Sequence, residues 1–187
     1  HIILEDGEQI SVDACNIYAT MDLASTGSDR TAIIITAVDS QRRVFIIDII
    51  AGHFNPYDKT KAVLTAQMEW QPLKFGIEKA GMQNEFFYTL DVAIKEYGIN
   101  VNVHELSHGG KSKNIRIATL HPLFMTNKIY FNKAHKLTVQ LEAELSAFDE
   151  DMEGVHDDLI DALAYIMHFI RGRTFKDRGE RKKGLYF

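Results

Sequence analysis

The sequence NIYATMDLASTGSDRTAIIITAVDSQRRVFIIDII, residues 16–50, contains three short hydrophobic runs that are rich in β-branched side chains. The runs cover residues 16–24, 31–38 and 43–50, and small or polar residues separate them. Runs of this composition, bounded by turn-forming residues, are typical of strands joined by hairpins. We therefore expect three consecutive antiparallel strands.

The remainder of the chain alternates helical and extended patterns. The expected helices cover residues 57–70, 82–97, a stretch ending near 124, 135–148 and 157–170; the expected strands are one ending at Glu78, one at 101–106 and a short NKIYF run. Three hairpin strands followed by alternating units predict an α/β fold. We expect a mixed five-stranded sheet, three antiparallel strands then parallel strands, with helices on both faces.

Length and composition indicate one domain. The chain has 187 residues, of which 45% are hydrophobic, enough for a single core. We assign residues 1–172 to this domain and residues 173–187 to a basic tail whose composition is compatible with disorder. The single cysteine, Cys15, excludes an intrachain disulfide and a CxxC metal site, which favours a reducing compartment. No segment has the length of a membrane span or the order of a signal peptide.

The charge is distributed in blocks, although the net value is −5. Residues 111–136 contain six Lys or Arg and no acid, whereas residues 137–161 contain nine acids and no Lys or Arg. A polyanion could dock on the basic segment while the acidic segment holds cations beside it. Ordinary solvated surface charge is the alternative interpretation.

Two acids lie in the expected strands. Asp22 lies within the first strand, in ATMDLAST, and Glu78 lies at the end of the fourth, in FGIEKAG. Carboxylates at the ends of strands in an α/β sheet commonly project into the crevice where ligands bind. Gly76 and Gly81 leave space around the backbone near Glu78. Both acids are therefore candidate site residues.

Three aspartates open the last helix, in HDDLIDALAY (156–165). At about 100° per residue, Asp157 and Asp161 lie on one face, Asp158 on its flank and apolar residues opposite. Aspartates in a first turn complement the helix dipole, but one would be enough. Three close carboxylates repel one another unless a cation lies among them.

Together the acids suggest a site for hard divalent cations. Mg²⁺ and Mn²⁺ take oxygen ligands, usually carboxylates together with substrate phosphates. Two such ions can activate water on one side of a phosphodiester and stabilise the leaving oxygen on the other. The pattern therefore predicts two-metal phosphodiester hydrolysis.

The motifs MDLAST, GIEKAG and HDDLIDALAY resemble those of the ribonuclease H-like superfamily. Most closely, they resemble the C-terminal nuclease domain of the large terminase subunit of tailed bacteriophages, over roughly residues 16–170. The resemblance implies a metal-dependent endonuclease that cuts double-stranded DNA with little sequence specificity. It also implies viral genome packaging in the cytoplasm of an infected bacterial host.

The resemblance implies which acids bind metal. Asp22, Glu78, Asp157 and Asp158 would be the catalytic set, with Asp161 as an auxiliary metal ligand. Holliday-junction resolvases of the superfamily close with a similar pattern that would select Asp158 and Asp161 instead. Which of the three helix aspartates bind metal directly therefore remains open.

The loop GGKSKN (109–114) is a candidate for DNA contacts. We expect Lys111, Lys113 and Arg116 to approach DNA phosphates, with backbone NH groups beside them. An ordinary mobile surface loop is the alternative.

A complete large terminase also carries an ATPase domain in the same chain and works with a small terminase subunit and a portal. The phosphate loop GxxxxGK[ST] is absent, because the first glycine that GGKS would require falls on Glu105. The chain begins with His1 rather than Met. We therefore expect an excised nuclease half.

Three other functions compete with this one. The same fold and metal chemistry could serve a resolvase, a transposase-like enzyme or an RNA-cutting ribonuclease H. The segment DLASTGSDRTAI (22–33) loosely resembles the phosphate hairpin of actin-like and sugar-kinase-like proteins, which require a second, similar domain. A non-catalytic docking module would use its acids only structurally.

Overall fold

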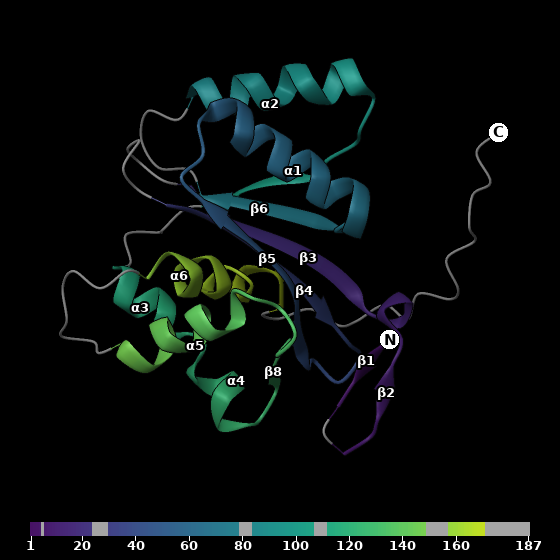
Figure 1. Cartoon of the computed structure of the whole chain (residues 1–187), viewed down its shortest axis with the longest axis vertical. Helices are drawn as coiled ribbons and strands as arrows, with labels where there is room; N and C mark the ends of the chain where they lie inside the picture. Colours follow the sequence, from purple (N-terminus) through teal and green to yellow (C-terminus); the bar gives the residue numbers. More distant parts are fainter. Residues whose placement is uncertain (5, 24–29, 79–83, 107–111, 149–156, 171–187) are drawn as a thin grey trace.

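A computed structural model of the chain describes residues 1–4, 6–23, 30–78, 84–106, 112–148 and 157–170. Its main sheet contains β3 (Asn16–Asp22), β4 (Thr31–Val38), β5 (Val44–Gly52), β6 (Lys74–Glu78), β7 (Val103–Leu106) and β8 (Ile129–Phe131). The spatial order is β7-β6-β3-β4-β5-β8 (Figure 1). The hairpins β3–β4 and β4–β5 are antiparallel, whereas β6, β7 and β8 join by parallel pairing.

The predicted mixed α/β sheet is confirmed, with one correction. The described sheet has six strands rather than five, because the short β8 pairs with the first residues of β5. Two short antiparallel strands, β1 (Ile2–Ile3) and β2 (Gln9–Ile10), also precede β3. A 3₁₀ turn at Val12–Ala14 connects β2 to β3. Runs of two or three residues carry too little periodicity to predict pairing.

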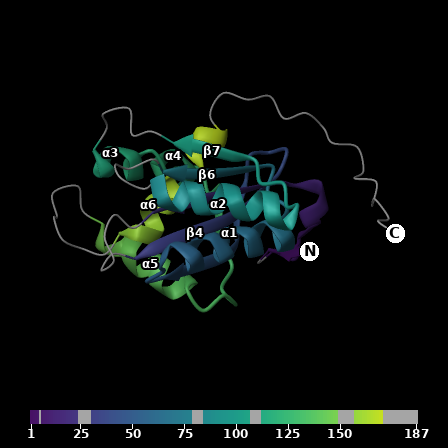
Figure 2. The ribbon, with the colours of Figure 1, turned by 90° about the horizontal axis from the view of Figure 1, so that it is seen from above.

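Helices cover both faces of the sheet. They are α1 (Pro56–Trp70), α2 (Asn84–Tyr97), α3 (Lys113–Ala118), α4 (His121–Met125), α5 (Thr138–Ala147), α6 (Asp158–Ala164) and α7 (Met167–Ile170). Seen from above, α1 and α2 lie side by side across one face (Figure 2). The helices α3, α5 and α6 lie on the other face (Figure 1). None of the described helices is long and apolar enough to cross a membrane.

Side-chain alternation along the strands separates two hydrophobic cores. Ile33 and Ile35 of β4 belong to the core beneath α1 and α2, whereas Ala32 and Ile34 belong to the core beneath α6. Successive side chains of a strand point to opposite faces. Because both faces are covered, all eight residues of β4 are buried, which explains why the strand is apolar apart from two threonines.

The C-terminal helix differs from the amphipathic helix that we expected over residues 157–170. It divides into α6 and α7, and residues Leu159–Ala164 are buried all round, Asp161 included. His168 of α7 is exposed, whereas Asp161 of α6 is buried. The expected space at Gly76 is filled: a Cβ there would lie 2.7 Å from Leu106 and 2.9 Å from Phe169. The last helices therefore belong to the core.

Candidate metal centre

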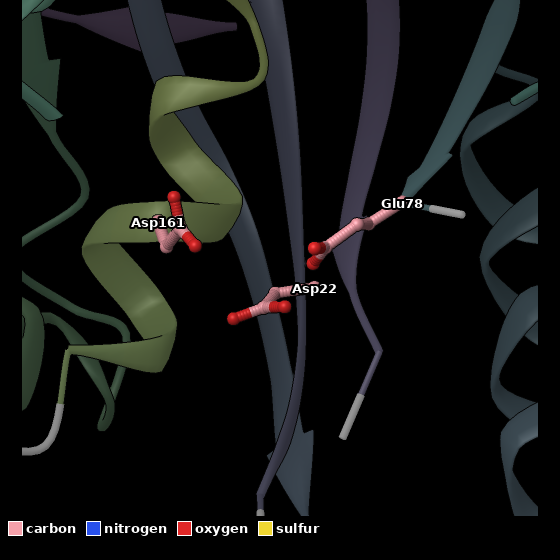
Figure 3. A group of neighbouring side chains, drawn as sticks. All are labelled: Asp22, Glu78 and Asp161. Atoms are coloured by element: carbon pink, nitrogen blue, oxygen red, sulfur yellow. The ribbon is translucent and has the colours of Figure 1, made fainter. Parts of the chain in front are cut away.

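Two carboxylates meet where parallel strands β3 and β6 end. The register pairs Met21 with Ile77, so the next residue of each strand, Asp22 or Glu78, lies at the same edge of the sheet. Both side chains are buried, with 7% and 6% exposure, and their carboxylates point toward one another (Figure 3). The parallel register is therefore the reason that acids 56 positions apart in the sequence are neighbours.

Helix α6 brings the third carboxylate. It packs across β3 and β4, and Asp161, 1% exposed, faces the two strand acids (Figure 3). One oxygen from each of Asp22, Glu78 and Asp161 lies within 4.8 Å of the other two. Three converging carboxylate oxygens are a donor set that Mg²⁺ or Mn²⁺ prefers. The residues present therefore fit a hard divalent cation.

The electrostatics of this cluster also favour a cation. Burial raises the pKa of Asp22 well above its usual value, and the hydrogen bond with Glu78 and the charges of Asp161 and Glu78 raise it further. Burial likewise raises the pKa of Asp161, although Arg116 and Lys113 oppose this effect. Ionising Asp22 and Asp161 together is therefore costly in this structure, and a divalent cation would offset that cost.

Two cations from α3 face the cluster. Arg116, 9% exposed, donates from Nε to Oδ1 of Asp161 at 3.0 Å and from Nη2 to Oδ2 at 2.5 Å. The Lys113 ammonium lies 2.6 Å from Asp157, 3.7 Å from Asp161 and 4.0 Å from Asp22. Burial lowers the pKa of Lys113, but the hydrogen bond to Asp157 and the nearby acids raise it overall. Lys113 is therefore a protonated counter-ion of the acids.

The sequence model of the family described as "Terminase RNaseH-like domain" matches residues 19–169. This chain belongs to the terminase RNase H-like domain family. The match spans every described acid of the cluster and confirms the predicted family. No curated protein sequence matches the chain.

Solved terminase nuclease domains have the same fold. The large terminase nuclease of thermophilic phage G20c with bound zinc has a TM-score of 0.60 at 17% identity, over 82% of this chain and 81% of that one. Its magnesium-bound form has a TM-score of 0.59 at 13% sequence identity, over 80% of this chain and 79% of that one. The Mn-soaked nuclease domain of the human cytomegalovirus terminase has a TM-score of 0.58 at 11% sequence identity, over 86% of this chain and 84% of that one.

In this terminase RNase H-like domain the other two helix aspartates lie at the start of α6. Asp157 is the N-cap residue, but its side chain does not cap the helix and instead accepts from Lys113. Asp158 is the first helical residue. The closely grouped acids among the described residues are thus Asp22, Glu78 and Asp161, with Asp157 held beside them by Lys113.

The cap of α6 comes from a residue that sequence reasoning missed. Glu144 of α5, 5% exposed, accepts from the backbone NH groups of Leu159 at 2.9 Å and Ile160 at 3.3 Å. Burial raises the pKa of Glu144, although these two hydrogen bonds lower it. No local motif indicates such a cap, because Glu144 lies 15 residues before Leu159, the nearer of the two residues that it caps.

The predicted DNA contacts have different surroundings. Lys111 lies outside the described residues. Lys113 is one-third exposed and stands at the acids, whereas Arg116 is buried against Asp161. Phosphate contacts by these residues stay predictions, and the geometry of Arg116 is that of an internal partner of Asp161.

Proposed function

We propose that this domain is the nuclease of a viral DNA-packaging motor, and that it hydrolyses double-stranded DNA with two divalent cations, Mg²⁺ or Mn²⁺, and little sequence specificity. The observation that carries this proposal is the buried group Asp22, Glu78 and Asp161 in a chain of the terminase RNase H-like family. The metal-bound forms of the G20c nuclease domain support it.

The proposal gives each acid a role. Asp22, at the centre of the group, would hold both cations, Glu78 would hold one, and the acids of α6 would hold the other. Bound there, the cations would activate water and stabilise the leaving oxygen of the phosphodiester. The protein contributes carboxylates fixed by strand ends and by a helix embedded in the core, so that little reorganisation is needed. The described geometry favours Asp161 as a direct ligand, and Asp157 and Asp158 remain proposed ligands.

The proposed setting follows from the family. DNA would be the substrate, and Lys111, Lys113 and Arg116 are the proposed phosphate contacts. In the full-length protein we propose an ATPase domain in the same chain, a small terminase subunit and a portal as partners, in the cytoplasm of the host.

Cleavage assays test the substrate class. The domain with Mn²⁺ is incubated with supercoiled plasmid, a four-way junction and an RNA/DNA hybrid, beside an Asp22→Asn control and a sample with chelator. We expect nicking and linearisation of the plasmid that both controls lack. Cleavage of the hybrid alone would replace the proposal with a ribonuclease H activity, and junction cleavage alone would indicate a resolvase.

A crystal soaked in Mn²⁺ tests the ligands. Anomalous difference peaks would show how many ions bind and which of Asp157, Asp158 and Asp161 lie within about 2.3 Å of them. A peak remote from Asp22 and Glu78 would contradict the proposed site.

A further inference from the structure

Lys113 occupies a position unlike that of an ordinary surface lysine. It is the first residue of α3, and the Ser112 side chain accepts from the Ile115 NH to cap that helix. The ammonium lies within 4.0 Å of three different carboxylates, those of Asp157, Asp161 and Asp22. Two of these belong to the proposed metal-binding group. The ammonium is thus placed among oxygens suited to a divalent cation.

The two cations of α3 differ in how firmly they are held. Arg116 is buried and binds Asp161 through two hydrogen bonds, a geometry that a planar guanidinium holds rigidly. The Lys113 side chain is 33% exposed and makes its short contact with Asp157 alone. A lysine has a flexible stem and a strongly hydrated head. Of these two cations, Lys113 is therefore the one that can leave.

Charge repulsion prevents the Lys113 ammonium and a divalent cation from occupying this position together. A divalent cation bound to Asp22 and Asp161 would lie close to the position of the Lys113 ammonium, and two like charges at such short range repel strongly. Resting on the proposed metal-dependent function, we propose that Lys113 is a displaceable internal cation, which partly balances the charge of Asp22, Asp157 and Asp161 without metal and leaves when a divalent cation binds.

Displacement would have two consequences for the site. The Asp157 carboxylate loses its partner and becomes available as a metal ligand. The released ammonium stays tethered at the rim of the site, where a DNA phosphate is its natural partner. Metal loading would thereby prepare a phosphate contact.

The test is Mn²⁺ binding without DNA, measured by isothermal titration calorimetry and by the loss of the free Mn²⁺ signal in electron paramagnetic resonance. Lys113→Met removes the charge and keeps the apolar stem, and Lys113→Gln is the second variant in case the first folds poorly. The matched control is Lys95→Met, because Lys95 forms an ion pair of the same 2.6 Å length with Asp91 on the solvent side of α2, where both side chains are exposed. Circular dichroism checks that each variant is folded.

We expect Lys113→Met and Lys113→Gln to bind Mn²⁺ about twofold to fivefold more tightly, since a partly exposed ion pair contributes about that factor, and Lys95→Met to match the wild type. Unchanged or weaker binding by both Lys113 variants would overturn this inference while the proposed function stands. If neither the wild type nor the variants bind Mn²⁺, the proposed function and the inference both fail. Binding by the Lys113 variants alone would support the inference.

Discussion

Asp22 is the residue at which stability and the proposed activity oppose each other. Its carboxylate is buried beside two other acids, and its pKa is raised well above the usual value. Ionised Asp22 therefore costs folding free energy in the metal-free domain. The same electrostatic cost is what would make the site attractive to a cation.

We predict that Asp22→Asn abolishes plasmid cleavage and raises the stability of the metal-free domain by on the order of 1 kcal/mol at neutral pH, about 2–4 °C in Tm. Because the pKa of Asp22 is higher in the folded state than in the unfolded state, the wild type loses stability as pH rises from the unfolded-state pKa to the folded-state pKa. The gain in stability from Asp22→Asn should therefore be complete above the folded-state pKa of Asp22 and vanish near its unfolded-state pKa. Urea unfolding from pH 4 to 8 measures it.

Two results would contradict the assignment of Asp22. Full residual cleavage by Asp22→Asn would exclude the carboxylate from the reaction. A variant less stable than the wild type at every pH would show that the carboxylate stabilises the metal-free domain.

Arg116 and Asp161 form the buried ion pair of the site. Arg116→Met should destabilise the domain by about 3–5 kcal/mol, because it leaves a carboxylate that is only 1% exposed without its main partner. The double variant Arg116→Met with Asp161→Asn should recover much of this loss, since no unpaired charge remains. A double-mutant cycle in urea measures the coupling. Additive losses would show that the pair is not coupled.

At the scale of the element, α6 is a helix of seven residues that an acid from another helix holds in place. Glu144 supplies the cap that Asp157, turned toward Lys113, does not. A short isolated helix is marginal in water, so packing in the core and this cap together stabilise α6. The position of Asp161 therefore depends on α5.

We predict that Glu144→Met lowers stability by about 1–2 kcal/mol through loss of the cap and weakens Mn²⁺ binding several-fold. Glu144→Gln keeps an acceptor oxygen and should retain most of the metal affinity. Glu142→Met, an exposed neighbour on the same helix, is the control. If Glu144→Met bound Mn²⁺ as tightly as the wild type, α6 would not need its cap to place Asp161.

At the scale of the whole molecule, the site joins β3 and β6 of the sheet to a helix that lies on only one of its faces. A cation that binds Asp22, Glu78 and Asp161 would therefore link elements that separate on unfolding. Ligands that bind only the native state stabilise it by mass action.

We predict that Mn²⁺ at about one hundred times its Kd raises the free energy of unfolding by about 2.7 kcal/mol, or about 5–10 °C in Tm. Differential scanning calorimetry measures the shift. Asp161→Asn should lose most of it, and Asp91→Asn, a change of an exposed side chain of α2, should keep it. No shift in the wild type would favour a non-catalytic module whose acids are structural.

The sequence by itself indicated the main strands and the two acids that they carry. Alternation and turn residues are local signals, and they placed residues 31–38 as a strand that the structure reproduces without change. The motifs with Asp22 and Glu78 also indicated the family. The parallel pairing of β3 with β6, a contact between distant parts of the chain, then brings these two acids together at one edge of the sheet.

Only the tertiary structure decided which of the helix aspartates lies beside Asp22 and Glu78. The rotation of α6 follows from burying Leu159 and Leu163 in the core and from the cap that Glu144 provides, and both are contacts with distant parts of the chain. Lys113 and Arg116 likewise reach the acids across 44 and 45 residues. Spacing within a helix defines its faces, but the direction of each face depends on what packs against it.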